Sequence, residues 1–170
     1  KWLQNLQWWM CRVLRLRGLY AITPEGLGTD TLVAAVGSAL DGGAALLQYR
    51  NKAASAGLRR EQALALLALS RGRNVPMIVN DDVELAASID ADGVHVGRDD
   101  WQVAAARMKL PGKLLGVSCY ASLERAREAV AEGADYVAFG SVFVSATKPQ
   151  AVRAPLALFG QARTLGVPLV

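Results

Sequence analysis

From Gly18 onward, short apolar segments alternate with segments of helical periodicity, and this alternation restricts the fold more than any other feature of the chain. Short apolar segments bounded by turn residues are typical of buried strands. The segments we expect to form strands are Leu19–Thr23, Leu46–Arg50, Met77–Asp81, Val94–Gly97, Leu114–Cys119, Tyr136–Val142 and Val167–Val170. Helical patterns lie between them, near residues 30–41, 59–71, 83–89, 101–108, 122–132 and 156–165.

Repeated strand–helix units favour a parallel α/β fold, and the first predicted strand is not followed by the Gly-x-Gly-x-x-Gly motif of dinucleotide-binding folds. We therefore expect a (βα)8 barrel of the TIM-barrel type. About seven strands are present and the chain stops within the apolar segment Val167–Val170, so we expect a barrel truncated at its C-terminus. Gly42, Gly72 and Gly133 follow three of the helical patterns and predict left-handed helix C-caps.

Residues 1–17 differ from the rest and predict an amphipathic basic helix, whereas residues 18–170 form the predicted barrel domain. Trp2, Leu6, Trp9 and Val13 are among the apolar residues that recur at helical spacing in this segment. Such a helix can pack across one end of the domain, bind a membrane surface or a partner, or belong to sequence upstream of the working domain.

Composition excludes several classes of protein. A hydrophobic content of 52% is sufficient for a sizeable core, and a net charge of +4 suits an anionic small molecule better than nucleic acid. The cysteines, Cys11 and Cys119, form neither a disulfide framework nor a zinc motif, so we expect a protein of the reducing cytoplasm. No apolar segment is long enough for a membrane span. The single histidine, His95, lies inside a predicted strand, and we expect it to be packed rather than catalytic.

Polar side chains follow the second predicted strand at the point where it ends. Gln48, Arg50 and Lys52 alternate along this segment and are expected to point the same way. Carboxyl ends of parallel strands are where α/β folds build their sites. Two cations on one side suit a diphosphate, although an exposed strand end would also explain them.

Carboxylates follow the third and fourth predicted strands. Asp81 and Asp100 form the pair that we expect to bind Mg²⁺, because this ion prefers one or two carboxylates together with phosphate oxygens. The alternative is helix capping, since Asp81 precedes Glu84 and Asp99 precedes Gln102 by three residues.

Five motifs in order resemble the thiamine phosphate synthase family, and the resemblance covers about residues 18–170. They are Leu47-Gln48-Tyr49-Arg50-Asn51-Lys52, Asn80-Asp81, His95-Val96-Gly97 with Asp100, Gly116-Val117-Ser118, and Gly140-Ser141-Val142-Phe143 with Thr147-Lys148. The family usually has Pro-Thr-x-Thr-Lys where this chain has Val144-Ser145-Ala146-Thr147-Lys148, and serine retains the hydroxyl group.

The resemblance implies an enzyme that joins a hydroxymethylpyrimidine diphosphate to a thiazole phosphate and releases pyrophosphate. It implies that the pyrimidine diphosphate is bound by Gln48, Arg50, Lys52, Asn80, Ser118 and Lys148, with Arg50, Lys52, Ser118 and Lys148 acting in catalysis. It also implies that Asp81 and Asp100 hold Mg²⁺, and that Ser145, Ala146 and Thr147 contact the thiazole phosphate.

The implied mechanism is dissociative: the pyrophosphate departs first, and the thiazole nitrogen then attacks a stabilised pyrimidine cation. Two other functions stay open. One is a thiazole tautomerase relative, against which Arg50, Lys52, Asn80 and Asp81 argue, and the other is a non-catalytic barrel that binds a phosphate ligand or a partner. A homo-oligomer is also possible, because an open barrel edge can be covered by a second copy.

Overall fold

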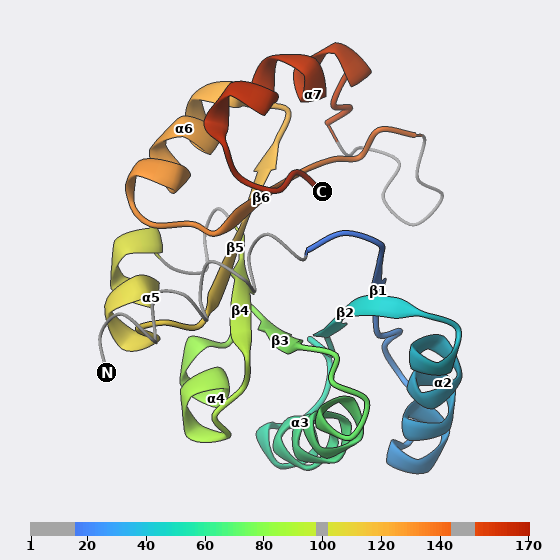
Figure 1. Ribbon diagram of the computed structural model, residues 1–170. Helices are drawn as coiled ribbons and strands as arrows, with labels where there is room; N and C mark the ends of the chain where they lie inside the picture. Colours follow the sequence, from blue (N-terminus) through green and yellow to red (C-terminus); the bar gives the residue numbers. More distant parts are fainter. Residues whose placement is uncertain (1–15, 98–101, 144–151) are drawn as a thin grey trace. The chain divides into compact units, whose positions relative to one another are not determined.

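The computed structural model describes residues 16–97, 102–143 and 152–170 (Figure 1). These residues fall into two compact units, one from Leu16 to His95 and one from Val96 to Val170. Nearly all of the predicted N-terminal helix, residues 1–17, lies outside the described residues. The division into segments 1–17 and 18–170 therefore stays a prediction.

The unit from Leu16 to His95 is built from parallel strands in chain order, with a helix between each pair of strands (Figure 1). Strand β1 pairs with β2, β2 with β3, and β3 with β4. The elements are β1 (Leu19–Ile22), α2 (Thr29–Asp41), β2 (Ala44–Tyr49), α3 (Ala56–Arg71), β3 (Met77–Asn80), α4 (Val83–Ser88) and β4 (Gly93–Val96).

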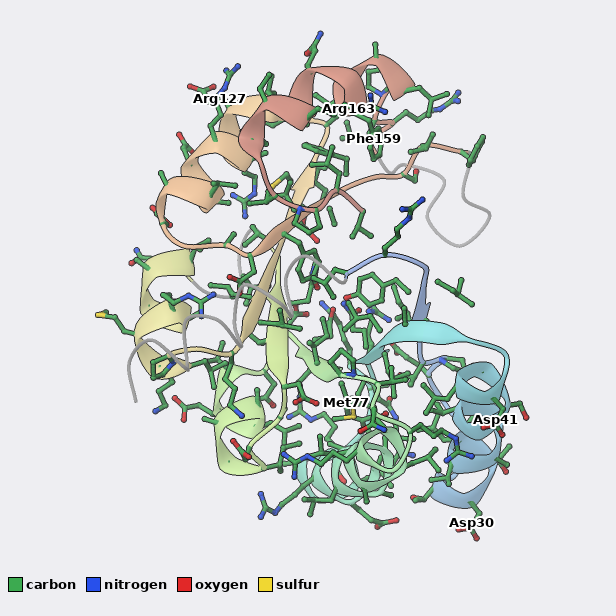
Figure 2. All side chains as sticks on the ribbon, in the orientation of Figure 1. Asp30, Asp41, Met77, Arg127, Phe159 and Arg163 are labelled. Atoms are coloured by element: carbon green, nitrogen blue, oxygen red, sulfur yellow. The ribbon has the colours of Figure 1, made fainter. Side chains whose placement is uncertain are left out.

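Strands β2 and β3 supply the core of this unit. Leu46, Leu47 and Tyr49 are successive or nearly successive residues, and all are buried. Burial of successive residues is expected of a parallel strand, because both faces of a parallel sheet are normally covered. Met77 lies among the side chains inside the unit, whereas Asp41 extends outward from α2 (Figure 2). The continuous apolar runs in the sequence thus mark strands with two covered faces.

The helix ends correct one prediction. Gly42 and Gly72 are C-caps with right-handed backbone, and the left-handed residues come later, at Gly43 (φ +94°) and Asn74 (φ +56°). Gly133 does adopt the predicted left-handed conformation, with φ +103°. The first two helices continue their right-handed turn through the glycine before the chain reverses, so glycine placement alone located these turns to within one or two residues.

The unit from Val96 to Val170 contains two strands that pair in parallel, with a helix between them. Its elements are α5 (Val103–Lys109), β5 (Leu114–Tyr120), α6 (Leu123–Ala131), β6 (Tyr136–Phe139), α7 (Leu156–Ala162) and the 3-10 helix η1 (Arg163–Leu165). Phe139 on β6 packs edge-to-face against Phe159 on α7, with ring centroids 5.5 Å apart. This contact places α7 against the β6 face that bears Phe139.

Six strands form among the described residues, so the predicted count of seven is wrong. The seventh segment, Val167–Val170, makes only an isolated parallel bridge, between Val137 and Leu169. Its Pro168 accepts a hydrogen bond from Val137 through its carbonyl but has no N–H group to donate in return, which limits the ladder. Parallel strands joined by helices confirm the α/β class and a TIM-barrel-like fold.

A buried aspartate immediately precedes both β4 and β6, and the two aspartates form the same pair of hydrogen bonds. Asp92 accepts a hydrogen bond from the backbone N–H of Met77 at 3.0 Å and donates its own N–H to the Met77 carbonyl at 3.0 Å. Asp135 does the same with Leu115, at 2.7 and 2.8 Å. Each aspartate therefore satisfies a backbone N–H at the start of the neighbouring strand, that of the first residue of β3 or of the second residue of β5, which would otherwise be a buried orphan donor.

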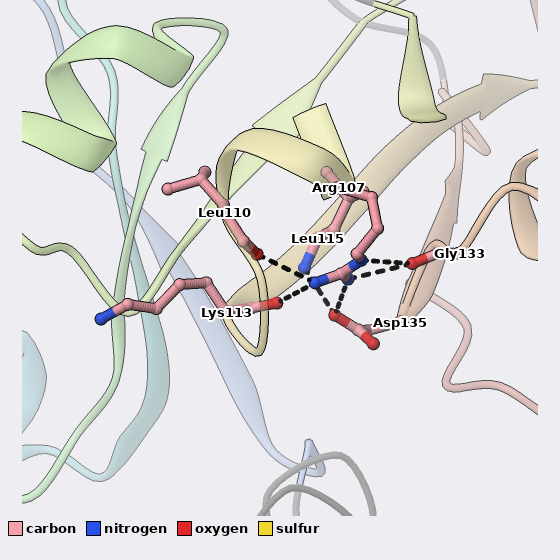
Figure 3. A network of polar contacts seen from close by, with 6 residues as sticks. All are labelled: Arg107, Leu110, Lys113, Leu115, Gly133 and Asp135. Carbon is pink, nitrogen blue, oxygen red and sulfur yellow. Dashed lines mark hydrogen bonds and ion pairs between the residues drawn. The ribbon is translucent and has the colours of Figure 1, made fainter. Parts of the chain in front are cut away.

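Arg107 reinforces the second of these arrangements (Figure 3). Its Nη2 lies 2.6 Å from Asp135 Oδ2 and 2.9 Å from the Gly133 carbonyl, and its Nη1 donates to the carbonyls of Leu110 and Lys113. A single guanidinium thus holds three backbone carbonyls and one buried carboxylate, which fixes the loops that precede β5 and β6.

No helix among the described residues combines the length and apolarity that crossing a membrane requires.

Candidate active site

The predicted cations follow β2, and each contacts a carboxylate of its own unit. Arg50 Nη1 forms an ion pair with Glu25 Oε1, and Lys52 Nζ lies 2.6 Å from Asp81 Oδ2. Gln48 is buried within β2 and donates from Nε2 to Tyr20 Oη at 2.5 Å. Gln48 and Arg50 thus reach toward β1 and the loop after it, whereas Lys52 reaches toward the end of β3.

Asn80 is the last residue of β3, and Asp81 follows it with an unusual backbone conformation. Asp81 has φ +62°, a left-handed conformation that aspartate tolerates better than most residues. Its N–H donates to the His95 carbonyl at 2.8 Å, which ties the end of β3 to β4. Asp82, not Asp81, caps helix α4, because the Asp82 side chain accepts from Leu85 N–H at 2.9 Å. The capping alternative for Asp81 is therefore wrong.

The carboxylate of Asp81 suits Mg²⁺ by its chemistry. It is partly exposed, with 20% of its side chain accessible, and Lys52 already contacts one of its oxygens. No group of three or more His, Cys, Asp or Glu side chains suited to a metal occurs among the described residues. A partly exposed carboxylate is a ligand type that Mg²⁺ accepts, because this ion is commonly held by one or two carboxylates together with phosphate oxygens. The second predicted ligand, Asp100, lies outside the described residues.

Two buried polar residues that the sequence did not reveal hold these chain segments in place. Thr23 Oγ1 accepts from Arg50 N–H at 2.8 Å and donates to the Arg50 carbonyl at 3.0 Å. Gln62 on α3 accepts from Tyr49 Oη at 2.9 Å and from Asn51 Nδ2 at 3.1 Å. Burial raises the pKa of Tyr49 to about 12, so its hydroxyl remains a donor at neutral pH.

In the other unit, Ser118 lies near the end of β5 beside an irregularity in the β5–β6 pairing. The pairing shifts between Ser118 and Tyr120, and Tyr120 has φ +54°. Arg125 on α6 donates from Nε to the Ser118 carbonyl at 2.9 Å and from Nη2 to the Gly97 carbonyl at 3.2 Å. Arg125 thus orients the backbone at Ser118. The predicted residues Ser145, Ala146, Thr147 and Lys148 lie outside the described residues.

The titratable side chains near these strand ends are poorly suited to proton transfer. His95 is buried, as predicted, and burial lowers its pKa to about 4, although Asp81 opposes the shift. Burial raises the pKa of the Cys119 thiol to about 11, against the opposing charge of Arg125. At neutral pH the His95 side chain is therefore uncharged and the Cys119 side chain is a thiol, so neither is suited to act as a general acid or a nucleophile. The charged side chains at these strand ends can instead bind and position an anionic ligand.

Comparison with known proteins agrees with the resemblance. A family model described as thiamine monophosphate synthase matches residues 19–170. The thiamine-phosphate synthase of Aromatoleum aromaticum is 59% identical over 157 residues, which cover 91% of this chain and 76% of that protein. The corresponding protein of Methylobacillus flagellatus is 55% identical over 156 residues, covering 91% and 75%. Thiamine phosphate pyrophosphorylase from Pyrococcus furiosus superposes with a TM-score of 0.80 at 32% identity, covering 94% of this chain and 75% of that structure.

Proposed function

Because the chain belongs to the thiamine monophosphate synthase family, we propose that it joins 4-amino-2-methyl-5-(diphosphooxymethyl)pyrimidine to thiazole phosphate, forming thiamine phosphate and pyrophosphate. The bond between the pyrimidine methylene carbon and the diphosphate oxygen breaks, and its electron pair leaves with pyrophosphate. The lone pair of the thiazole nitrogen then forms the new carbon–nitrogen bond. No proton is removed from the nitrogen, so the step needs no general base.

The observation that carries this proposal is the grouping of Arg50, Lys52 and Asp81 at the ends of β2 and β3. Lys52 Nζ lies 2.6 Å from Asp81 Oδ2, so a cation and a candidate metal ligand are adjacent. Arg50 adds a planar guanidinium suited to two phosphate oxygens. Gln48 and Asn80 flank these charges with amide groups that can fix the pyrimidine, and Gln48 is itself held by Tyr20.

Asp81 and Asp100 are the residues we propose to hold Mg²⁺. When bound, the ion would neutralise charge on the departing pyrophosphate. Arg50, Lys52 and Lys148 would contribute hydrogen bonds and positive charge to the same leaving group. Ser118, oriented through Arg125, would bind the pyrimidine diphosphate, and Ser145, Ala146 and Thr147 would contact the thiazole phosphate. The neutral His95 and the protonated Cys119 are compatible with a reaction driven by charge stabilisation.

The alternatives are less well supported. A thiazole tautomerase has no need of a pyrimidine diphosphate, whereas this chain retains Arg50, Lys52, Asn80 and Asp81. A non-catalytic phosphate-binding barrel would not explain why the relatives at 55% and 59% identity are synthases. We further propose that the protein acts in the cytoplasm on small-molecule substrates, and a homo-oligomer stays a prediction.

Neighbouring aspartates offer a matched test of the metal assignment. We expect Asp81→Asn to remove most synthase activity and to weaken Mg²⁺ binding, measured by calorimetry with Mg²⁺ and inorganic pyrophosphate. Asp82→Asn is the control, because Asp82 is adjacent but caps α4. Because asparagine caps helices about as well as aspartate, this variant should change stability by less than about 1 kcal/mol and retain Mg²⁺-dependent activity. Near-normal turnover by the Asp81 variant would refute the metal assignment.

A further inference from the structure

Glu25 is a carboxylate that the proposed mechanism does not use, yet it forms an ion pair with Arg50. Both side chains are about one third exposed, at 32% for Glu25 and 28% for Arg50, so a ligand can reach the pair from solvent. In this unit the two cations proposed to bind the diphosphate, Arg50 and Lys52, each contact a carboxylate. Asp81 already has a proposed role as a metal ligand, whereas Glu25 has none.

The segment that carries Glu25 is fastened to the end of β2. Thr23 is 5% exposed, and its hydroxyl bonds both the N–H and the carbonyl of Arg50. Its own N–H donates to the Gln48 carbonyl at 3.0 Å. In addition, Gln62 donates from Nε2 to the Leu27 carbonyl at 2.9 Å, two residues beyond Glu25. The segment is thus anchored on both sides of Glu25, which keeps its carboxylate beside the Arg50 side chain.

We propose that Glu25 is a displaceable counter-ion for Arg50 that positions the guanidinium and competes with pyrophosphate for it. This inference rests on the proposed function, because it assumes that Arg50 binds the diphosphate group. A diphosphate, which carries more negative charge than one carboxylate and can use both cations, displaces Glu25 on binding. After the carbon–oxygen bond has broken, the return of Glu25 to Arg50 favours release of the product. Glu25 is in this sense a positioning residue that acts through Arg50.

The sign of the effect separates this role from a structural one. Removing the charge of Glu25 should tighten pyrophosphate binding, whereas damage to the site would weaken it. We expect Glu25→Gln to lower the Kd for inorganic pyrophosphate in the presence of Mg²⁺ by about two- to fivefold, the range that partly exposed ion pairs support. The inhibition constant of pyrophosphate in the synthase reaction should fall by the same factor. Glu25→Asp, which keeps the charge, should stay within about twofold of the wild type.

Asp41→Asn is the matched control. It removes one negative charge from another arginine–carboxylate pair of the same unit, because Asp41 pairs with Arg73 at 2.8 Å at the opposite end of α2 from Glu25. Its pyrophosphate affinity should equal that of the wild type, which excludes a general effect of net charge. Isothermal titration calorimetry of the full chain with pyrophosphate and Mg²⁺ provides the measurement.

Unchanged or weaker pyrophosphate binding by the Glu25→Gln variant would overturn the inference while leaving the proposed function intact. Equal tightening in the Asp41→Asn control would also overturn it, because the effect would then reflect net charge alone. Failure of the wild type itself to bind pyrophosphate would reject the diphosphate site at Arg50 and Lys52, and with it both the inference and the proposed function.

Discussion

Arg107 provides a sharp test of how the unit from Val96 to Val170 is held together. Its guanidinium contacts Asp135, whose side chain is only 1% exposed, and three backbone carbonyls. Arg107→Met keeps most of the aliphatic stem but removes every one of these hydrogen bonds. Removing one partner of a buried ion pair typically costs about 3–5 kcal/mol, since the other charge stays buried. We expect a loss of this size at pH 7.

The loss should depend on pH in a defined direction. Burial raises the pKa of Asp135 above its ordinary value, and the charge of Arg107 opposes the shift. Without Arg107 the pKa rises further, so the folded variant takes up a proton more readily than its unfolded chain does. Lowering the pH therefore stabilises the variant relative to the wild type, and the deficit should shrink between pH 7 and pH 5.

Urea denaturation followed by circular dichroism measures both effects. Arg73→Met is the control, because Arg73 pairs with Asp41 at the surface, where Asp41 is 65% exposed. That variant should lose much less stability than the Arg107 variant at either pH, because water and salt screen an exposed ion pair. A deficit below about 1 kcal/mol in the Arg107 variant at pH 7, or a deficit that does not shrink on acidification, would refute this account of the Arg107 network.

Two further predictions concern packing and protonation. An added Cβ at Gly116 would lie 2.0 Å from Cζ of the buried Tyr136, so Gly116→Ala should destabilise the protein by about 1–3 kcal/mol or more. The control is Gly57→Ala on α3, where an added Cβ meets open space and should be neutral or stabilising. Thermal unfolding compares the two variants with the wild type. Burial lowers the pKa of His95 to about 4, so its contribution to stability is complete above pH 6.5 and is lost as the pH falls toward 4. The wild type should therefore lose stability between pH 7 and pH 4.5, and His95→Gln should reduce this loss by up to about 3 kcal/mol, as measured by urea titrations at the two pH values. An identical pH dependence in the wild type and the variant would contradict the lowered pKa of His95.

The chemistry at the strand ends was predictable because it is local in sequence. Gln48, Arg50 and Lys52 directly follow an apolar run, and Asp81 directly follows another, so the parallel α/β pattern alone brings them to strand ends. The helix predicted near residues 59–71 begins earlier, at Ala56, because the Ser55 side chain caps it. Capping by a serine outside the apolar periodicity leaves only a weak signal in the sequence.

The partners of these side chains could not be predicted, because they depend on the alignment of distant segments. Glu25 forms its ion pair with Arg50, and Thr23 forms its hydrogen bonds to the Arg50 backbone, because β1 and β2 pair in a particular register. This register aligns Ile22 with Gln48. Arg125 is equally hidden in the sequence of α6, since its hydrogen bonds are to backbone carbonyls. The equivalent aspartates that precede β4 and β6 do leave a signal in the sequence, because the same dipeptide, Ala91-Asp92 or Ala134-Asp135, precedes each strand.

Product formation by this chain is the decisive measurement of its activity. The protein is supplied with the pyrimidine diphosphate and the thiazole phosphate, with Mg²⁺ or with a chelator, and thiamine phosphate and pyrophosphate are quantified together. We expect Mg²⁺-dependent formation of the two products in equal amounts, with little product from the Asp81→Asn variant. Absence of thiamine phosphate in the presence of Mg²⁺, or equal turnover with the chelator, would contradict this expectation.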